Sequence, residues 1–226
     1  AKALAPPPPP RAFRQEARRI LAGLDDEAKA GQVLLVGLGG QARLSANEAS
    51  ALKELGPGGL VLFGFNIGED LDSVGILIDG LQAVARDSKA GLPFLVAVDH
   101  EGGPVFRFKS GLTHLPAAAL VGSRGPAYAR ALGEIGGAEL RALGFNLALA
   151  PGVELSRKDN AQFLGQRTYG QDAPTVDRAA GAFIQGLESR GVAATAKHFP
   201  GNAGVDPHKG LPRLEVDRAE LERDYL

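Results

Sequence analysis

Five short apolar runs recur along the chain, and each passes into a glycine-rich or polar turn. The runs are nearly continuous in apolar residues instead of alternating with polar ones, which is typical of parallel strands buried on both faces. They occupy Val33–Val36, Leu60–Phe65, Phe94–Val98, Leu147–Ala150 and Val192–Ala196. The pattern therefore predicts five buried parallel strands.

Helix-like stretches separate the predicted strands. Ser45 and Glu48 have the spacing of a capping box and Gly56 precedes a proline, so a helix is expected between these signals. Later helices are expected near Asp70–Asp87, Ala127–Leu143, Thr175–Arg190 and Val216–Leu226. This alternation indicates about five βα units.

Repeated βα units can close into a (β/α)₈ TIM-type barrel or lie open as a doubly wound sheet, and periodicity alone does not distinguish the two. Five strands are too few for an eight-stranded barrel, and Leu226 falls within the last expected helix. We therefore expect an α/β fold, an incomplete (β/α)₈ TIM-type barrel, over residues 11–226. The proline run at residues 6–10 predicts that residues 1–10 form a tail or linker.

The composition mainly excludes certain partners and chemistries. The 226 residues include 25 Lys plus Arg and 26 Asp plus Glu, a formal net charge of −1 that disfavours nucleic acid as a partner. The absence of Cys rules out disulfides and thiolate nucleophiles. No apolar stretch approaches the ~18 residues of a membrane helix, so no membrane insertion is expected. Oligomeric state and localisation, cytoplasmic or exported, stay open.

Charged residues follow the third predicted strand in the stretch Asp99-His100-Glu101-Gly102-Gly103. A carboxylate at a strand end can accept hydrogen bonds from the hydroxyl groups of a ligand. Arg107, further along, could return to the same site as a planar donor. The alternative is a solvated loop with a local Asp99–Arg107 ion pair.

Further candidates follow the last two predicted strands. An Asp-His pair can hold an imidazole in one tautomer and raise its proton affinity, so Asp206 would make His208 a candidate proton shuttle. Two alternatives are an exposed polar turn and a metal site formed by His198, Asp206 and His208, which the neighbouring Lys197 would oppose. Arg167 could reach the same site or form an ordinary salt bridge in its loop.

Together, four stretches resemble the bacterial β-N-acetylglucosaminidases of glycoside hydrolase family 3. They are Asp99-His100-Glu101-Gly102-Gly103 with Arg107, Phe145-Asn146-Leu147-Ala148-Leu149-Ala150-Pro151, Arg167-Thr168-Tyr169-Gly170, and Lys197-His198-Phe199-Pro200-Gly201 followed by Asp206-x-His208. Their order and spacing agree with the family from about residue 27 to the end of the sequence.

The resemblance implies a TIM-type catalytic barrel that removes terminal β-linked N-acetylglucosamine, with retention of configuration, from peptidoglycan-derived or related glycans. In the family, a loop histidine paired with an aspartate serves as acid/base, and these roles fall on His208 and Asp206. No metal or organic cofactor is implied, and the partner is a carbohydrate. The side chains implied to hold the sugar hydroxyls are Asp99, Arg107, Arg167, Lys197 and His198.

The sequence also departs from the family pattern. The family's nucleophilic aspartate lies in a Ser-Asp-Asp-like motif on a later strand, and no such motif precedes Leu226. Asn202 stands where the family usually has a second loop histidine, and Pro104 where it usually has an arginine. We expect a fragment of an active hydrolase, because a barrel without its last units would expose two sheet edges. The alternative is a catalytically inactive sugar-binding or scaffold protein.

Overall fold

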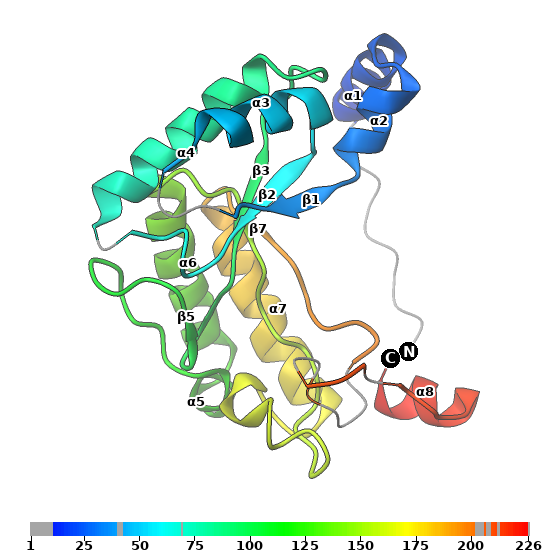
Figure 1. Ribbon diagram of the computed structural model, residues 1–226. Coiled ribbons are helices and arrows are strands. Elements are labelled where there is room, and N and C mark those ends of the chain that lie inside the picture. The colour runs from blue at the N-terminus through cyan, green and yellow to red at the C-terminus, as the bar shows by residue number, and fades with distance from the viewer. Residues whose placement is uncertain are drawn as a thin grey trace.

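The computed structural model describes residues 11–39, 43–68, 70–201, 206, 209–211 and 213–225. Helices and strands alternate along most of this range (Figure 1). The helices are α1 (Arg11–Gly23), α2 (Asp26–Gln32), α3 (Ala46–Leu55), α4 (Leu71–Arg86), α5 (Ala118–Arg124), α6 (Pro126–Ala142), α7 (Ala173–Ser189) and α8 (Arg218–Asp224), with a short 3₁₀ helix, η1 (Gly165–Arg167). The strands are β1 (Leu35–Gly37), β2 (Gly59–Leu62), β3 (Leu95–Val98), β4 (His100–Gly102), β5 (Val105–Phe106), β6 (Leu147–Ala148) and β7 (Ala193–Ala194).

Five strands form one parallel sheet in the order β1-β2-β3-β6-β7, and β4 and β5 form a separate antiparallel pair. The order of the five follows the chain without a reversal, whereas a doubly wound sheet reverses direction at a switch point. Figure 1 shows α3, α4, α6 and α7 following one another around one side of this sheet. The expected α/β fold, part of a (β/α)₈ barrel with five parallel strands, is confirmed.

Local signals fix the helix ends where the sequence predicts them. At α3, the Ser45 hydroxyl accepts a hydrogen bond from the Glu48 backbone N–H, and the Glu48 carboxylate accepts one from the Ser45 backbone N–H. Gly56 ends this helix with φ 56°, a left-handed conformation that glycine adopts without strain. The side chains of Asp70 and Asp172 cap the N-termini of α4 and α7 by accepting hydrogen bonds from the backbone N–H groups of Ser73 and Thr175. The helices α1, α2 and α5 and the β4–β5 hairpin were not predicted.

The core lies between the sheet and the helices. Its largest fully buried side chains include Phe94, Phe145 and Phe183. The Asn146 side chain joins β6 to β3 because it accepts a hydrogen bond from the Val96 N–H (2.7 Å) and donates one to the Phe94 carbonyl (3.1 Å). Burial of apolar side chains holds the sheet against the helices, at about 1.5–3 kcal/mol for each large residue.

The helices α6 and α7 cross closely because glycines face each other at the contact. A Cβ at Gly186 would overlap the carbonyl oxygen of Arg130. We expect Gly186→Ala to lower the free energy of unfolding by about 1–3 kcal/mol through overpacking. Gly181→Ala on the same helix is the matched control, because nothing lies within 4 Å of its Cβ position. Urea denaturation should show that the control variant is stabilised by about 0.5–1 kcal/mol; equal losses would contradict this account of the crossing.

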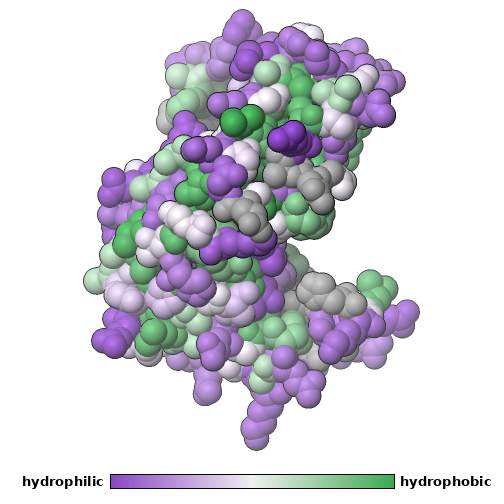
Figure 2. All heavy atoms as spheres, turned by 60° about the vertical axis from the view of Figure 1, so that its left-hand side comes forward, coloured by the Kyte–Doolittle hydropathy of each residue, from purple (hydrophilic) through white to green (hydrophobic). Residues whose placement is uncertain are grey.

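The face shown in Figure 2 is largely hydrophilic with scattered hydrophobic residues, and it is indented at one edge. Among the helices of the described ranges, none has the length and apolar character needed to cross a membrane.

Candidate functional site

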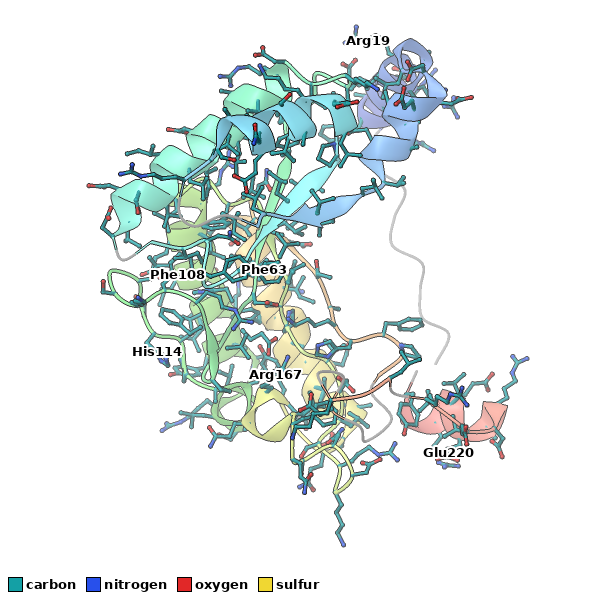
Figure 3. All side chains as sticks on the ribbon, in the orientation of Figure 1. Arg19, Phe63, Phe108, His114, Arg167 and Glu220 are labelled. Atoms are coloured by element: carbon teal, nitrogen blue, oxygen red, sulfur yellow. The ribbon has the colours of Figure 1, made fainter. Side chains whose placement is uncertain are left out.

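Five charged side chains converge beyond the C-terminal ends of the parallel strands. Asp99 directly follows β3, Glu101 lies in β4, and Arg107 follows β5. Arg167 ends η1 in the connection after β6, and Lys197 follows β7. In Figure 3, Arg167 lies on the side of the sheet toward which the strand ends point. We call these five residues the ion-pair network.

Lys197 is central to the ion-pair network. Its Nζ lies 2.6 Å from Asp99 Oδ1 and 2.7 Å from Glu101 Oε1. The second carboxylate oxygen of Asp99 accepts a hydrogen bond from Arg107 Nη2 at 3.0 Å. Asp99 is therefore held from both sides by cations that come from different strand ends.

Arg167 binds Glu101 through two parallel hydrogen bonds. Its Nε donates to Oε2 and its Nη2 donates to Oε1, each over 2.8 Å. This bidentate geometry fixes both planes and is among the strongest side-chain pairings in proteins. The Glu101 side chain is only 4% exposed, so the pair is shielded from water.

The network keeps both carboxylates ionised. Burial alone would raise the pKa of Asp99, but the hydrogen bonds and charges of Lys197 and Arg107 outweigh it and hold this pKa below its usual range. For Glu101, burial likewise acts upward, and Arg167 and Lys197 together lower the pKa. Both groups are consequently hydrogen-bond acceptors at neutral pH.

His198 pairs with a different carboxylate. Its Nδ1 lies 2.7 Å from Glu154 Oε1, and the Glu154 side chain is largely buried. The backbone holds the pair in place, because the Val153 N–H donates to the Lys197 carbonyl over 2.6 Å and joins the segments that follow β6 and β7. The structure therefore places His198 next to Lys197 in the chain but outside the contacts of the ion-pair network.

A cavity of about 430 Å³ adjoins His198 and Glu154. Its walls come from α7, from the segments after β6 and β7, and from α8, with Val176, Ala180, Ile184 and Tyr225 among the lining residues. Asp99, Glu101 and Arg167 are not part of the lining. The cavity is thus separate from the ion-pair network, and of the paired side chains described above only His198 and Glu154 line it.

The predicted acid/base pair is described only in part. Asp206 Oδ2 lies 3.8 Å from Lys209 Nζ. His208 lies outside the described residues, so the pairing of Asp206 with His208 stays a prediction. Within the described ranges, no group of three or more acidic or histidine residues is arranged to hold a metal ion.

The structure unites four of the predicted site residues, Asp99, Arg107, Arg167 and Lys197, and adds Glu101 as the group that joins two of them. Glu101 and Glu154 were not among the predicted site residues. The available signal for Glu101 was alternation along an extended segment, which points residues 99 and 101 to the same face. The combination of a partly exposed carboxylate, a buried one and fixed cations suits a neutral ligand rich in hydroxyl groups.

The chain is similar to one family of proteins along most of its length. Residues 26–226 match the family described as Glycosyl hydrolase family 3 N terminal domain. The Beta-hexosaminidase of Methylococcus capsulatus is 38% identical over 194 residues, which cover 81% of this chain and 55% of that protein. That of Alkalilimnicola ehrlichii is 37% identical over 198 residues, or 84% of this chain and 55% of that protein. The chain thus spans about half the length of these curated relatives.

Solved structures show the same similarity. A glycoside hydrolase family 3 beta-N-acetylglucosaminidase from Paenibacillus superposes with a TM-score of 0.83 at 33% identity, covering 90% of this chain and 39% of that one. NagZ from Neisseria gonorrhoeae, in complex with N-trifluoroacetyl-D-glucosamine, superposes with a TM-score of 0.75 at 30% identity, covering 85% of this chain and 58% of that one.

Proposed function

Because this chain belongs to glycosyl hydrolase family 3, we propose that it is the sugar-binding part of a retaining β-N-acetylhexosaminidase. The substrate is a terminal β-linked N-acetylglucosamine of a peptidoglycan-derived or related glycan. The ion-pair network at the strand ends carries this proposal, and the relatives named Beta-hexosaminidase support it. Nothing in the described ranges favours the alternative of an inactive scaffold.

The network has hydrogen-bonding capacity left for a sugar. Two of the three N–H groups of Lys197 go to Asp99 and Glu101, which leaves one for a ligand. Each Asp99 oxygen accepts one hydrogen bond from a cation and can accept a second from a hydroxyl group. These groups bind the sugar hydroxyls without having to reorganise.

The remaining roles belong to loop residues and to a group outside this sequence. His208, oriented by Asp206, donates a proton to the glycosidic oxygen while a carboxylate nucleophile attacks the anomeric carbon. His208 then takes a proton from the water that releases the sugar. The nucleophile comes from a part of the barrel outside these 226 residues. His198, held by Glu154, binds a sugar hydroxyl beside the network.

Replacement of Asp99 tests the binding role. We expect the full-length product of the gene to bind N-acetylglucosamine and Asp99→Asn to weaken binding by about 10- to 100-fold, since hydrogen bonds to a charged group contribute about 1.5–3 kcal/mol. Asp87→Asn is the control, because Asp87 also bonds a lysine, Lys53, but lies exposed beyond α4. Isothermal titration calorimetry measures both affinities.

Hydrolysis is assayed with the full-length product of the gene and an aryl β-N-acetylglucosaminide. Release of the phenol is the expected result. A folded full-length protein that releases none would overturn the proposed activity, and an Asp99→Asn variant that binds the sugar normally would overturn the proposed site.

A further inference from the structure

Two phenylalanine rings lie exposed at the end of β2, beside the ion-pair network. Phe63 is 39% exposed and Phe65 is 59% exposed. Their rings stack on one another, with centroids 5.5 Å apart and planes inclined by 20°. One edge of the Phe63 ring packs over Gly37 of β1, and the rest of the stacked pair is apolar surface that is open to solvent.

The sheet register sets this pair next to Asp99. Leu62 of β2 aligns with Val98 of β3, so Phe63 and Asp99 are the first residues beyond the aligned strand ends. A Cβ at Gly64 would lie only 3.8 Å from Cδ of Arg107, whose guanidinium bonds Asp99. The Arg107 side chain therefore lies beside the turn that carries both rings. Figure 3 shows Phe63 on the same side of the sheet as Arg167.

A buried asparagine holds this turn in one conformation. Asn66 is completely buried, and its Oδ1 accepts a hydrogen bond from the Phe63 N–H at 2.9 Å. Its Nδ2 donates to the Leu38 carbonyl at 3.3 Å, which ties the turn to the segment after β1. The two rings are thus presented by a fixed backbone, and little conformational entropy is lost when a ligand packs on them.

We infer that Phe65, supported by Phe63, is a stacking platform for the sugar ring linked to the terminal N-acetylglucosamine, so the site selects a pyranose ring on its leaving side. This inference rests on the proposed function. The polar network takes the hydroxyl groups of the terminal ring, and the apolar pair lies next to it, at the end of the neighbouring strand β2. Polar groups that orient a ligand beside aromatic walls that bury its apolar faces are the usual composition of a small-molecule site.

The test compares the binding of N-acetylglucosamine and N,N′-diacetylchitobiose by isothermal titration calorimetry to the full-length product of the gene, which carries His208→Ala to suppress turnover of the disaccharide. We expect the disaccharide to bind more tightly than the monosaccharide. Phe65→Ala should weaken disaccharide binding by about three- to tenfold and change monosaccharide binding less than about twofold. Phe65→Tyr, which keeps the ring, should retain the preference for the disaccharide. Phe13→Ala, at an exposed phenylalanine of α1, is the matched control and should change neither affinity.

The outcomes separate this inference from the proposed function. If the full-length protein without a substitution at Phe65 fails to bind N-acetylglucosamine, the proposed function and this inference both fail. If the monosaccharide binds and Phe65→Ala leaves the disaccharide preference intact, the inference alone is overturned. Equal losses for the two ligands would likewise overturn it, because Phe65 would then contact the terminal ring. Unchanged thermal unfolding of Phe65→Ala shows that the turn held by Asn66 survives the substitution.

Discussion

Replacing Glu101 by glutamine is expected to lower the free energy of unfolding by about 3–5 kcal/mol, the usual loss when one partner of a buried ion pair is removed. Glutamine has nearly the same shape but no charge, and its NH₂ group would face N–H donors. Arg167 would lose the carboxylate that it binds with two hydrogen bonds, and Lys197 would keep only Asp99. The loss is large because the Glu101 side chain is 4% exposed and water cannot replace these bonds.

Glu134 offers a matched control for this prediction. It also binds two cations, Arg130 and Arg190, but lies on the solvent-accessible surface of α6 with 31% of its side chain exposed. Glu134→Gln should therefore change the stability far less than Glu101→Gln, since exposed ion pairs contribute little. Urea denaturation measures both variants. Similar losses for the two would show that burial of the Glu101 contacts does not govern their contribution.

Glu101→Gln should also weaken sugar binding, although the proposed contacts of the sugar are with other members of the network. Without the Glu101 carboxylate, the positions of Lys197 and Arg167 are no longer fixed by opposing charges. The affinity for N-acetylglucosamine, measured by calorimetry on the folded variant, is expected to fall. An unchanged affinity would mean that Asp99 alone positions Lys197.

Much of the fold could be predicted from the sequence because its strands and helix ends depend on local signals. The nearly continuous apolar runs mark the five parallel strands, and the capping box at Ser45 marks the start of α3. By contrast, α1 has no apolar face that the fold buries, and all its residues are exposed or only partly buried. The short helix α5 begins at Ala118 without a side-chain cap, so its sequence carries no start signal.

The sequence predicted that the site residues lie beyond the strand ends, but it did not predict which charged side chains pair with one another. The motifs placed Asp99, Arg167 and Lys197 beyond separate strands, and the parallel sheet then brings them together. Which charges pair with which depends on side-chain direction and packing between distant segments. Successive side chains in the extended stretch after β3 point to opposite faces. Asp99 and Glu101 therefore face the network, while His100 points the other way, into the core.

His100 is a buried polar residue next to the site, and no hydrogen bond within the described residues offsets the cost of its burial. It is fully buried beside Phe106 and Phe108, with ring centroids 5.4 Å and 5.8 Å away. Neither ring nitrogen has a hydrogen-bond partner within the described residues. Burial, with a smaller contribution from the charge of His114, lowers the pKa of His100 from 6.5 to about 4. The folded protein therefore holds this imidazole in its neutral form.

Because the pKa of His100 is lowered in the folded protein, the free energy of unfolding decreases as the solution is acidified. Below pH 6.5 the unfolded chain binds a proton at His100 that the folded protein does not take up until about pH 4, so stability falls as the pH falls through this window. The full difference corresponds to about 3 kcal/mol. Asp99 and Glu101 affect stability in a different pH range. Because their pKa values are lowered in the folded protein, the stabilisation that they contribute is lost only at pH values below the usual carboxylate range.

We expect His100→Leu to remove most of this pH dependence, because leucine fills a similar volume among the phenylalanine rings and cannot bind a proton. Between pH 7.5 and pH 4.5 the unchanged protein should lose about 2.5 kcal/mol more stability than the variant. Urea denaturation of both proteins at the two pH values measures this difference of differences, which cancels the contributions of other titrating groups. His114→Gln, at an exposed histidine of the same region, should keep most of the pH dependence. If His100→Leu loses as much stability on acidification as the unchanged protein, His100 is not the buried group whose protonation opposes folding.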